Sequence, residues 1–121
     1  MSDKHYSKAA IDLVATGATL LFTTENGARR FYVEDIFVVV TAADTLSVVA
    51  SASFGTNSTD YNNILAITAL TGTLAVNKSL KIPIVLAVDS VAANTGIYIK
   101  ITTGATAVSA SGKVIVRGFY E

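Results

Sequence analysis

The chain has 121 residues with nine basic and nine acidic side chains, so its formal net charge is zero, and it contains no cysteine. This length favours a single domain, and the absence of cysteine excludes disulfides, thiolate metal sites and a cysteine nucleophile. The balanced charge argues against nucleic-acid binding, which depends on basic residues that neutralise phosphates, and it mildly favours self-association.

The composition and the residue pattern both indicate β-structure. Val, Ile and Thr number 14, 10 and 15, and their β-branched side chains fit a pleated, half-buried surface better than a helix. Several segments also alternate apolar and polar residues with a period of two, which is the pattern of a strand with one buried face. The sequence therefore predicts an all-β protein.

The first nine residues are predicted to form a flexible or partner-docked arm, with the folded domain over residues 10–121. His5, the only histidine, is expected to face solvent in this arm, because no second histidine or cysteine completes a metal site or a triad. The apolar patch that follows is short and interrupted by Asp12, so neither a signal peptide nor a membrane helix is expected. We expect a soluble protein made in the cytoplasm, with no membrane partner.

Short turns rich in Gly, Asn, Asp, Ser and Thr separate eight predicted strands. The strands cover residues 10–15, 19–24, 29–41, 46–54, 63–68, 79–88, 96–103 and 112–120. Their number and spacing are typical of an antiparallel two-sheet β-sandwich of the jelly-roll type. An immunoglobulin-like sandwich is the alternative, although the chain lacks Trp and the cysteine pair of that fold.

Individual strands carry more specific signals. In 29–41 the apolar phase changes at the Glu34–Asp35 pair, which predicts a β-bulge or bend there. In 46–54 the alternation is regular, and the even-numbered residues are predicted to be buried. Pro83 cannot donate a ladder hydrogen bond, so the strand 79–88 is predicted at a sheet edge, where other chains can pair.

One long stretch is nearly free of charge. Between Ile36 and Asn77 only Asp44 and Asp60 are charged, whereas a monomer normally spreads charge over its exposed strand faces. Either small hydroxyl side chains solvate an outer sheet here, or another subunit covers this face.

The longest polar segment is the loop over residues 55–63. Its Asn and Asp side chains fit a structural loop that bonds its own backbone, and they also fit a partner contact. Such a contact is predicted at Asn57, Asp60, Tyr61 and Asn62, with the flat, amphipathic ring of Tyr61 as its anchor. A calcium site needs about six to eight oxygen ligands, and Asp60 is the only carboxylate in the loop. We therefore expect no metal and no cofactor.

No group of residues predicts catalysis. The chain has no Gly-x-Ser-x-Gly motif, and no base is available to activate a hydroxyl group. Glu34 and Asp35 are adjacent, so they would point to opposite faces of a regular strand, which disfavours paired acid–base chemistry. We expect no enzymatic activity.

Several short segments of the sequence resemble segments of a known group of proteins. They are Phe54-Gly55-Thr56-Asn57, Tyr61-Asn62-Asn63-Ile64-Leu65, Ala69-Leu70-Thr71-Gly72, Ala92-Ala93-Asn94-Thr95-Gly96-Ile97-Tyr98, Thr102-Thr103-Gly104-Ala105-Thr106-Ala107 and Gly118-Phe119-Tyr120. Through these segments, which fall within roughly residues 30–120, the chain resembles small virion structural proteins of tailed bacteriophages. The resemblance implies a β-sandwich that decorates or cements a capsid, or that serves as a fibre or tail accessory, often as a trimer.

These observations lead to one hypothesis and one alternative. The hypothesis is a non-enzymatic virion structural protein, made in the host cytoplasm. It would be a capsid decoration or cement protein that forms a homo-oligomer, a trimer if the resemblance holds, and binds the major capsid protein or another virion protein. The alternative is a phage fibre or tail accessory module that binds carbohydrate or a host surface.

Overall fold

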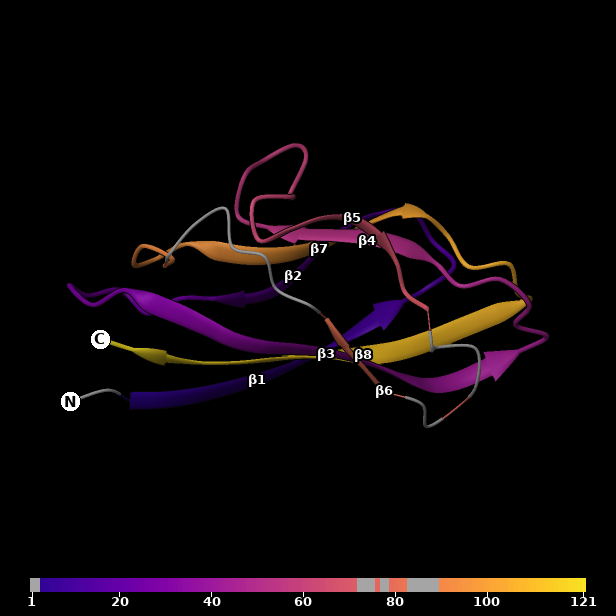
Figure 1. Ribbon diagram of the computed structural model, residues 1–121, viewed down its shortest axis with the longest axis horizontal. Coiled ribbons are helices and arrows are strands. Elements are labelled where there is room, and N and C mark those ends of the chain that lie inside the picture. Colours follow the sequence, from indigo (N-terminus) through magenta and orange to yellow (C-terminus); the bar gives the residue numbers. More distant parts are fainter. Residues whose placement is uncertain (1–2, 72–75, 77–78, 83–89) are drawn as a thin grey trace.

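The computed structural model describes residues 3–71, 76, 79–82 and 90–121, and they form two antiparallel four-stranded sheets packed face to face (Figure 1). Sheet A has the strand order β1-β8-β3-β6, with β1 at Asp3–Asp12, β8 at Ser109–Tyr120, β3 at Phe31–Asp44 and β6 at Ser79–Ile82. Sheet B has the order β2-β7-β4-β5, with β2 at Gly17–Thr23, β7 at Gly96–Thr103, β4 at Ser51–Gly55 and β5 at Leu65–Ala69.

This strand order is that of a jelly roll, in which the chain passes repeatedly from one sheet to the other. The predicted fold class is therefore confirmed. The immunoglobulin-like alternative is wrong, because that fold pairs its first two strands in one sheet, whereas β1 and β2 lie in different sheets here. Within the described ranges, no helix is long and apolar enough to cross a membrane.

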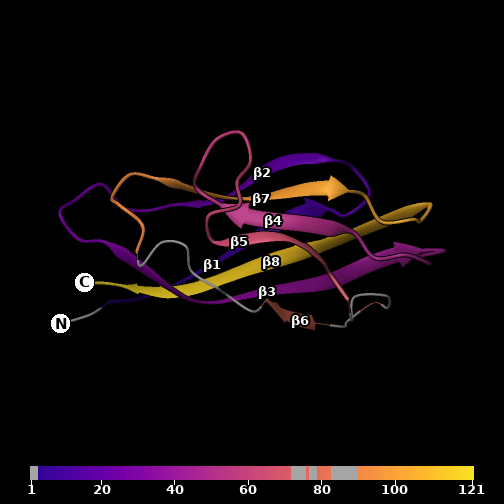
Figure 2. The same cartoon turned by 45° about the horizontal axis from the view of Figure 1, so that its top comes forward.

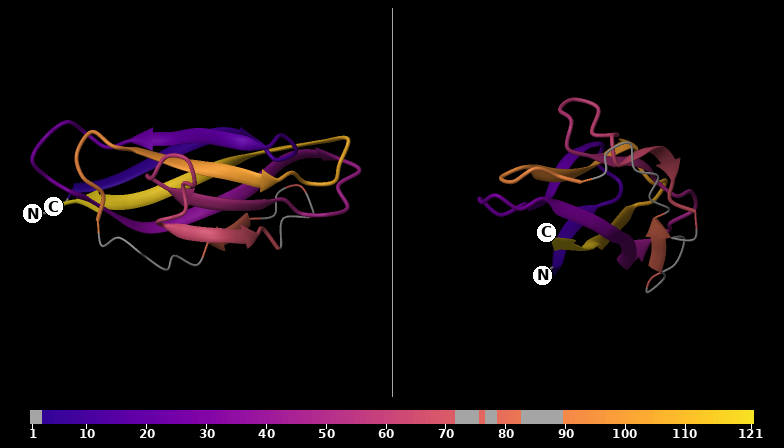
Figure 3. Two further views of the ribbon diagram at one scale, coloured as in Figure 1. Left: turned by 90° about the horizontal axis from the view of Figure 1, so that it is seen from above. Right: turned by 60° about the vertical axis from the view of Figure 1, so that its left-hand side comes forward.

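The long strands of sheet A bring the two termini together. β1 and β8 pair from Asp3 opposite Tyr120 to Asp12 opposite Ser111, so both chain ends lie at one end of the sandwich (Figures 2 and 3). The opposite end includes the connections 13–16, 45–50 and 104–108.

The core lies between the two sheets and follows the predicted period of two. Its largest fully buried side chains are Phe31, Phe54, Ile36, Ile64, Leu70, Ile82, Ile97, Ile99, Val38, Val40, Val114 and Val116. Each such side chain contributes about 1.5–3 kcal/mol relative to an exposed position. Packing of these alternating faces holds the described sheets together.

The bulge predicted in β3 is confirmed. The register of β3 against β8 shifts between Val33 and Asp35, so the inward phase changes from Phe31 and Val33 to Ile36 and the residues after it. The insertion of one residue also places the Glu34 and Asp35 side chains on the same outer face of sheet A, and not on opposite faces as a regular strand would.

The segment 46–54 differs from its prediction in the first half. Ala50, Ala52 and Phe54 are buried as expected, but Val48 is 55% exposed and β4 begins only at Ser51. Residues 45–50 carry the chain from sheet A to sheet B, so they cannot pair continuously with β7. Only an isolated bridge joins Val48 to Thr106.

The structure also differs from the predicted N-terminal arm, because residues from Asp3 onward belong to β1. The inward positions of this strand hold His5, Ser7, Ala9 and Ile11, and only the last is large and aliphatic. The alternation of inward and outward residues is present, but most of the inward side chains are small or polar, so the sequence did not reveal the strand. Pairing with the twelve-residue β8 supplies the order.

β6 is the outermost described strand of sheet A, in agreement with the predicted edge. It pairs with β3 from Ile36 opposite Ile82 to Val39 opposite Ser79. Pro83 and the remainder of the predicted strand 79–88 lie outside the described residues.

Candidate interaction surface

The charge-poor part of the chain contributes to two adjoining regions of the surface, which we call the uncharged surface. One region is the outer face of sheet B, where Leu20 and Ile67 are 45% and 60% exposed. The other is the end formed by the connections 45–50 and 104–108, where Val48 and Val108 are 55% and 73% exposed. The charged residues of these regions are Lys100, whose Nζ is bound to the carbonyl oxygen of Thr59, and Asp44, whose carbonyl oxygen accepts a hydrogen bond from Val108 N–H. Exposed apolar side chains with so few charges around them are typical of surfaces that bind other proteins.

The loop between β4 and β5 stands above the outer face of sheet B (Figure 1). Asn57 organises it, because its Oδ1 accepts hydrogen bonds from the backbone N–H groups of Asn62 at 2.8 Å and Asn63 at 3.2 Å. Asn57 Nδ2 donates to Asn62 Oδ1 at 2.9 Å, and Asn63 Oδ1 accepts from the backbone N–H of Thr56 at 2.7 Å. The prediction of a loop that bonds its own backbone is confirmed.

The loop is also bound to the sheet beneath it. Ser53 Oγ donates to the carbonyl oxygen of Asp60 at 3.1 Å, and Lys100 Nζ donates to that of Thr59 at 2.9 Å. The Tyr61 and Tyr98 rings pack with centroids 4.6 Å apart. Ser53 is consequently buried although it lies on the outward side of β4, a feature that the strand pattern alone did not predict.

The structure brings the four predicted contact residues into this one loop but assigns them different environments. The amide groups of Asn57 and Asn62 bond to each other, and Tyr61 is half-buried against Tyr98. Asp60 is exposed. A contact with another molecule through these residues remains a prediction.

His5 is the residue whose position differs most from the sequence prediction. Its imidazole stacks on Phe22, with ring centroids 4.5 Å apart, and meets the rings of Phe31 and Tyr120 edge-on at 5.8 and 5.9 Å. The atoms His5 Nε2 and Ser7 Oγ are buried with no hydrogen-bond partner in the described part of the chain. The prediction of a solvent-exposed tail residue is wrong, because His5 closes the aromatic end of the core.

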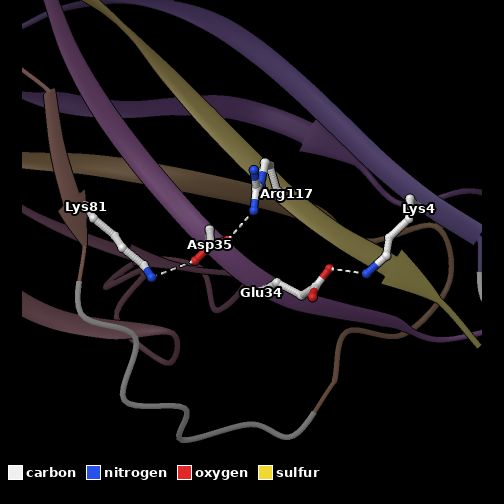
Figure 4. A network of polar contacts seen from close by, with 5 residues as sticks. All are labelled: Lys4, Glu34, Asp35, Lys81 and Arg117. Carbon is white, nitrogen blue, oxygen red and sulfur yellow. Dashed lines mark hydrogen bonds and ion pairs between the residues drawn. The ribbon is translucent and has the colours of Figure 1, made fainter.

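The two carboxylates at the bulge of β3 form ion pairs (Figure 4). Asp35 lies between Lys81 Nζ at 3.1 Å and Arg117 Nη2 at 2.7 Å, and Glu34 Oε1 lies 3.0 Å from Lys4 Nζ. The hydrogen bond from Lys81 lowers the pKa of Asp35, as do the bond from Arg117 and the charges of both cations, while desolvation opposes them. Asp35 therefore stays ionised as a structural partner, which is a poor state for a proton donor.

Among the residues that the structure describes, no group of three or more His, Cys, Asp or Glu side chains is placed to hold a metal ion. The ion pairs of Glu34 and Asp35 join neighbouring strands of sheet A, and the polar side chains of the 55–63 loop bond within the loop and to sheet B. The architecture itself is the strongest guide to function.

The comparisons with known proteins concern this architecture. No protein-family model and no curated protein matches the chain. Its fold recurs in bacteriophage capsid structures. A chain of the cyanophage Pam1 capsid asymmetric unit aligns with a TM-score of 0.66 at 16% identity, over 98% of this chain and 85% of that one.

A chain of the acidic stable capsid structure of Helicobacter pylori bacteriophage KHP30 aligns with a TM-score of 0.64 at 19% identity, over 98% of this chain and 93% of that one. At these identities the likeness establishes a common fold. It extends over nearly the whole of this chain and most of each neighbour.

Proposed function

We propose that this chain is a non-enzymatic structural protein of a bacteriophage virion, made in the host cytoplasm and located in the assembled particle. The observation that carries the proposal is the likeness in fold to chains from two phage capsid structures, which covers 98% of this chain in both cases. Fold alone does not determine function. Two further observations support the proposal: the uncharged surface, and the sequence segments that resemble those of phage virion proteins.

Within the virion, we propose the role of a capsid decoration or cement protein that binds the major capsid protein or another virion protein. A rigid sandwich that touches neighbouring coat subunits adds buried area that each subunit lacks alone, and several such contacts reinforce one another. This mechanism requires a firm scaffold and exposed contact surfaces, and it requires no reacting group.

The same proposal includes a homo-oligomer, with a trimer favoured by the resemblance. Its contacts would use the uncharged surface, where the apolar side chains of Ile67 and Val108 are exposed. Self-association would cover these apolar side chains at little desolvation cost. The loop residues Asn57, Asp60, Tyr61 and Asn62 stand beside this surface and are proposed as partner contacts.

Two measurements test the proposal. The first is the mass in solution, by light scattering, where an oligomer must exceed the 12.6 kDa of one chain. Ile67→Lys should shift the protein towards monomer because it places a charge in the contact. Ala28→Lys adds the same charge at an exposed position of the loop between β2 and β3 and should leave the mass unchanged. The second is co-sedimentation with coat-protein shells of the phage that encodes the chain, which should saturate. A monomer that ignores such shells would overturn the proposal.

The alternative is a fibre or tail accessory module that binds carbohydrate or a host surface. The observation in its favour is the adjoining pair of half-buried rings, Tyr61 and Tyr98, on the outer side of sheet B, since such rings offer flat, amphipathic contact area. A glycan array decides the matter. A saturable signal that Tyr61→Ala abolishes would favour the alternative, and the decoration role predicts no such signal.

A further inference from the structure

The outer face of sheet A, turned away from sheet B, gathers charged side chains that are far apart in the sequence. Its described cations are Lys4, Lys8, Lys81, Lys113 and Arg117, and its described carboxylates are Glu34, Asp35, Asp12 and Asp44. Asp12 and Asp44 lie opposite Ser111 and Ser109, at the end of the face away from the termini. The part of the face along residues 113–119 of β8 therefore holds five cations and two carboxylates, a local surplus of three positive charges in a chain whose formal net charge is zero. Sheet B has no comparable group on its outer face, since Lys100 is bound there to the carbonyl oxygen of Thr59.

The ion pairs of this face account for only part of its charge. Glu34 balances Lys4, and Asp35 is shared between Lys81 and Arg117, so one of the latter two charges is not neutralised (Figure 4).

Two further lysines of this face have no ion-pair partner in the described ranges. Lys8 lies opposite Ile115 and Lys113 opposite Ala10, so both lysines project from adjacent strands on the same face, one step apart along the ladder. Like charges at this spacing oppose each other, and carboxylates from outside would relieve that repulsion.

Aromatic rings lie beneath two of these cations, Lys4 and Arg117. Tyr32 and Phe119 are stacked with centroids 5.1 Å apart, and Lys4 Nζ lies 5.3 Å from the centre of the Phe119 ring. The Arg117 guanidinium lies 5.8 Å from the centre of the Phe37 ring. Rings beneath cations favour the charged group and reduce the freedom of its stem, so less entropy is lost when a partner binds.

The same face contains a hollow of about 380 Å³, with Lys4, Tyr6, Glu34 and Arg117 among the residues that line it. Tyr6 is 55% exposed at its edge. The hollow thus combines two cations, one carboxylate and a phenol around a concave space, and its one surplus positive charge suits an acidic side chain of a partner. Tyrosine and arginine are also the residue types that most often anchor protein interfaces.

We infer that the outer face of sheet A is the docking surface for a protein partner that presents carboxylates. The inference rests on the proposed function, in which that partner is the capsid shell. The two sides of the sandwich then have separate roles, with the cationic face of sheet A turned to the shell and the uncharged surface available to sister copies. Complementary charge accelerates the encounter and fixes its orientation.

The observations favour protein over nucleic acid as the partner. Nucleic-acid binding depends on an excess of basic residues that neutralise many phosphates, and this chain has nine basic and nine acidic side chains. The Tyr32 and Phe119 rings stack on each other, so their paired faces are closed to bases, which single-stranded nucleic acid needs for stacking.

The test compares two pairs of substitutions that change the net charge equally. Lys8→Gln with Lys113→Gln removes two positive charges from the face and retains most of each stem. Ala28→Glu with Ala92→Glu adds two negative charges at exposed positions in connections near the termini. Each protein is first checked for an unchanged melting temperature and oligomer mass. Co-sedimentation with coat-protein shells at about 50 and 500 mM NaCl then measures binding, and a labelled DNA duplex is titrated in parallel.

We expect the lysine pair to raise the concentration for half-saturation of the shells about tenfold at low salt, and the control pair to change it less than about twofold. High salt should weaken the wild type more than the lysine variant. If the wild type binds shells and the lysine variant binds equally well, the inference is overturned while the proposed function stands. Duplex binding that requires the two lysines would assign the face to nucleic acid and also overturn it. A wild type that binds no shells removes both proposals.

Discussion

Substitution of Gly118 by Ala tests the close packing of β8 against β3 near the aromatic end of the core. Gly118 lies opposite Val33, and its missing side chain would point into the core. A Cβ atom there would lie 2.2 Å from the carbonyl oxygen of Tyr32 and 2.5 Å from Cζ of Phe31. Non-bonded carbon contacts are favourable at about 3.5–4.0 Å, so the shortfall exceeds about 1 Å at both atoms.

Neither neighbour of Gly118 can move freely. The carbonyl oxygen of Tyr32 belongs to the backbone of β3, and the Phe31 ring is fully buried against Phe22 and Tyr120. Overpacking costs about 1–3 kcal/mol, and a backbone obstacle places Gly118→Ala near the upper end, at about 3 kcal/mol. For a domain of this size that corresponds to a fall in Tm of about 10–15 °C.

The assay is urea unfolding followed by circular dichroism, with thermal melts in parallel. Gly27→Ala is the matched control, because a Cβ atom at Gly27 meets nothing within 4 Å. Its unfolding free energy should stay within about 0.5 kcal/mol of the wild type. If Gly118→Ala is as stable as this control, the close approach of β3 and β8 described here is incorrect.

Two further predictions concern His5 and Asp35. His5→Ala should destabilise the protein by about 2–3 kcal/mol because it removes a ring from the aromatic end of the core. His5→Phe should be neutral or stabilising by about 1 kcal/mol, because it keeps a ring there and removes the buried Nε2 atom, which has no hydrogen-bond partner among the described residues. Urea unfolding measures both, and two neutral results would mean that residue 5 is not packed. For Asp35, the folded-state pKa lies below the ordinary value, so the ionised carboxylate stabilises the fold above about pH 4 and that stabilisation is lost as the pH falls through the folded-state pKa. The difference in urea midpoint between wild type and Asp35→Asn should therefore close between about pH 6 and pH 2.5, and a difference independent of pH would contradict the ion pairs.

The fold class could be predicted because its signals are local. A period of two, β-branched composition and turn residues act within a few neighbours, and each of the eight predicted strands overlaps an observed one. The bulge at Glu34–Asp35 was equally accessible, since a change of apolar phase within one strand leaves a mark in the sequence itself.

The candidate surfaces were only partly predictable. The loop at 55–63 was expected from its composition, but its attachment to Ser53, Tyr98 and Lys100 was not, because those partners lie on other strands. His5 was misplaced for a related reason. Its inward position is defined by Phe22, Phe31 and Tyr120, which contact it from three different elements.

The sequence by itself determined that this chain is all-β and that its middle carries almost no charge, because those properties depend on the order of residues along the chain. Only the tertiary structure decided which strands are neighbours, and thereby which side chains share a face. Lys8 and Lys113 are more than a hundred residues apart in the sequence and lie on adjacent strands through the pairing of β1 with β8. A net charge of zero concealed that separation of charge, since a sum over the chain contains no information about position.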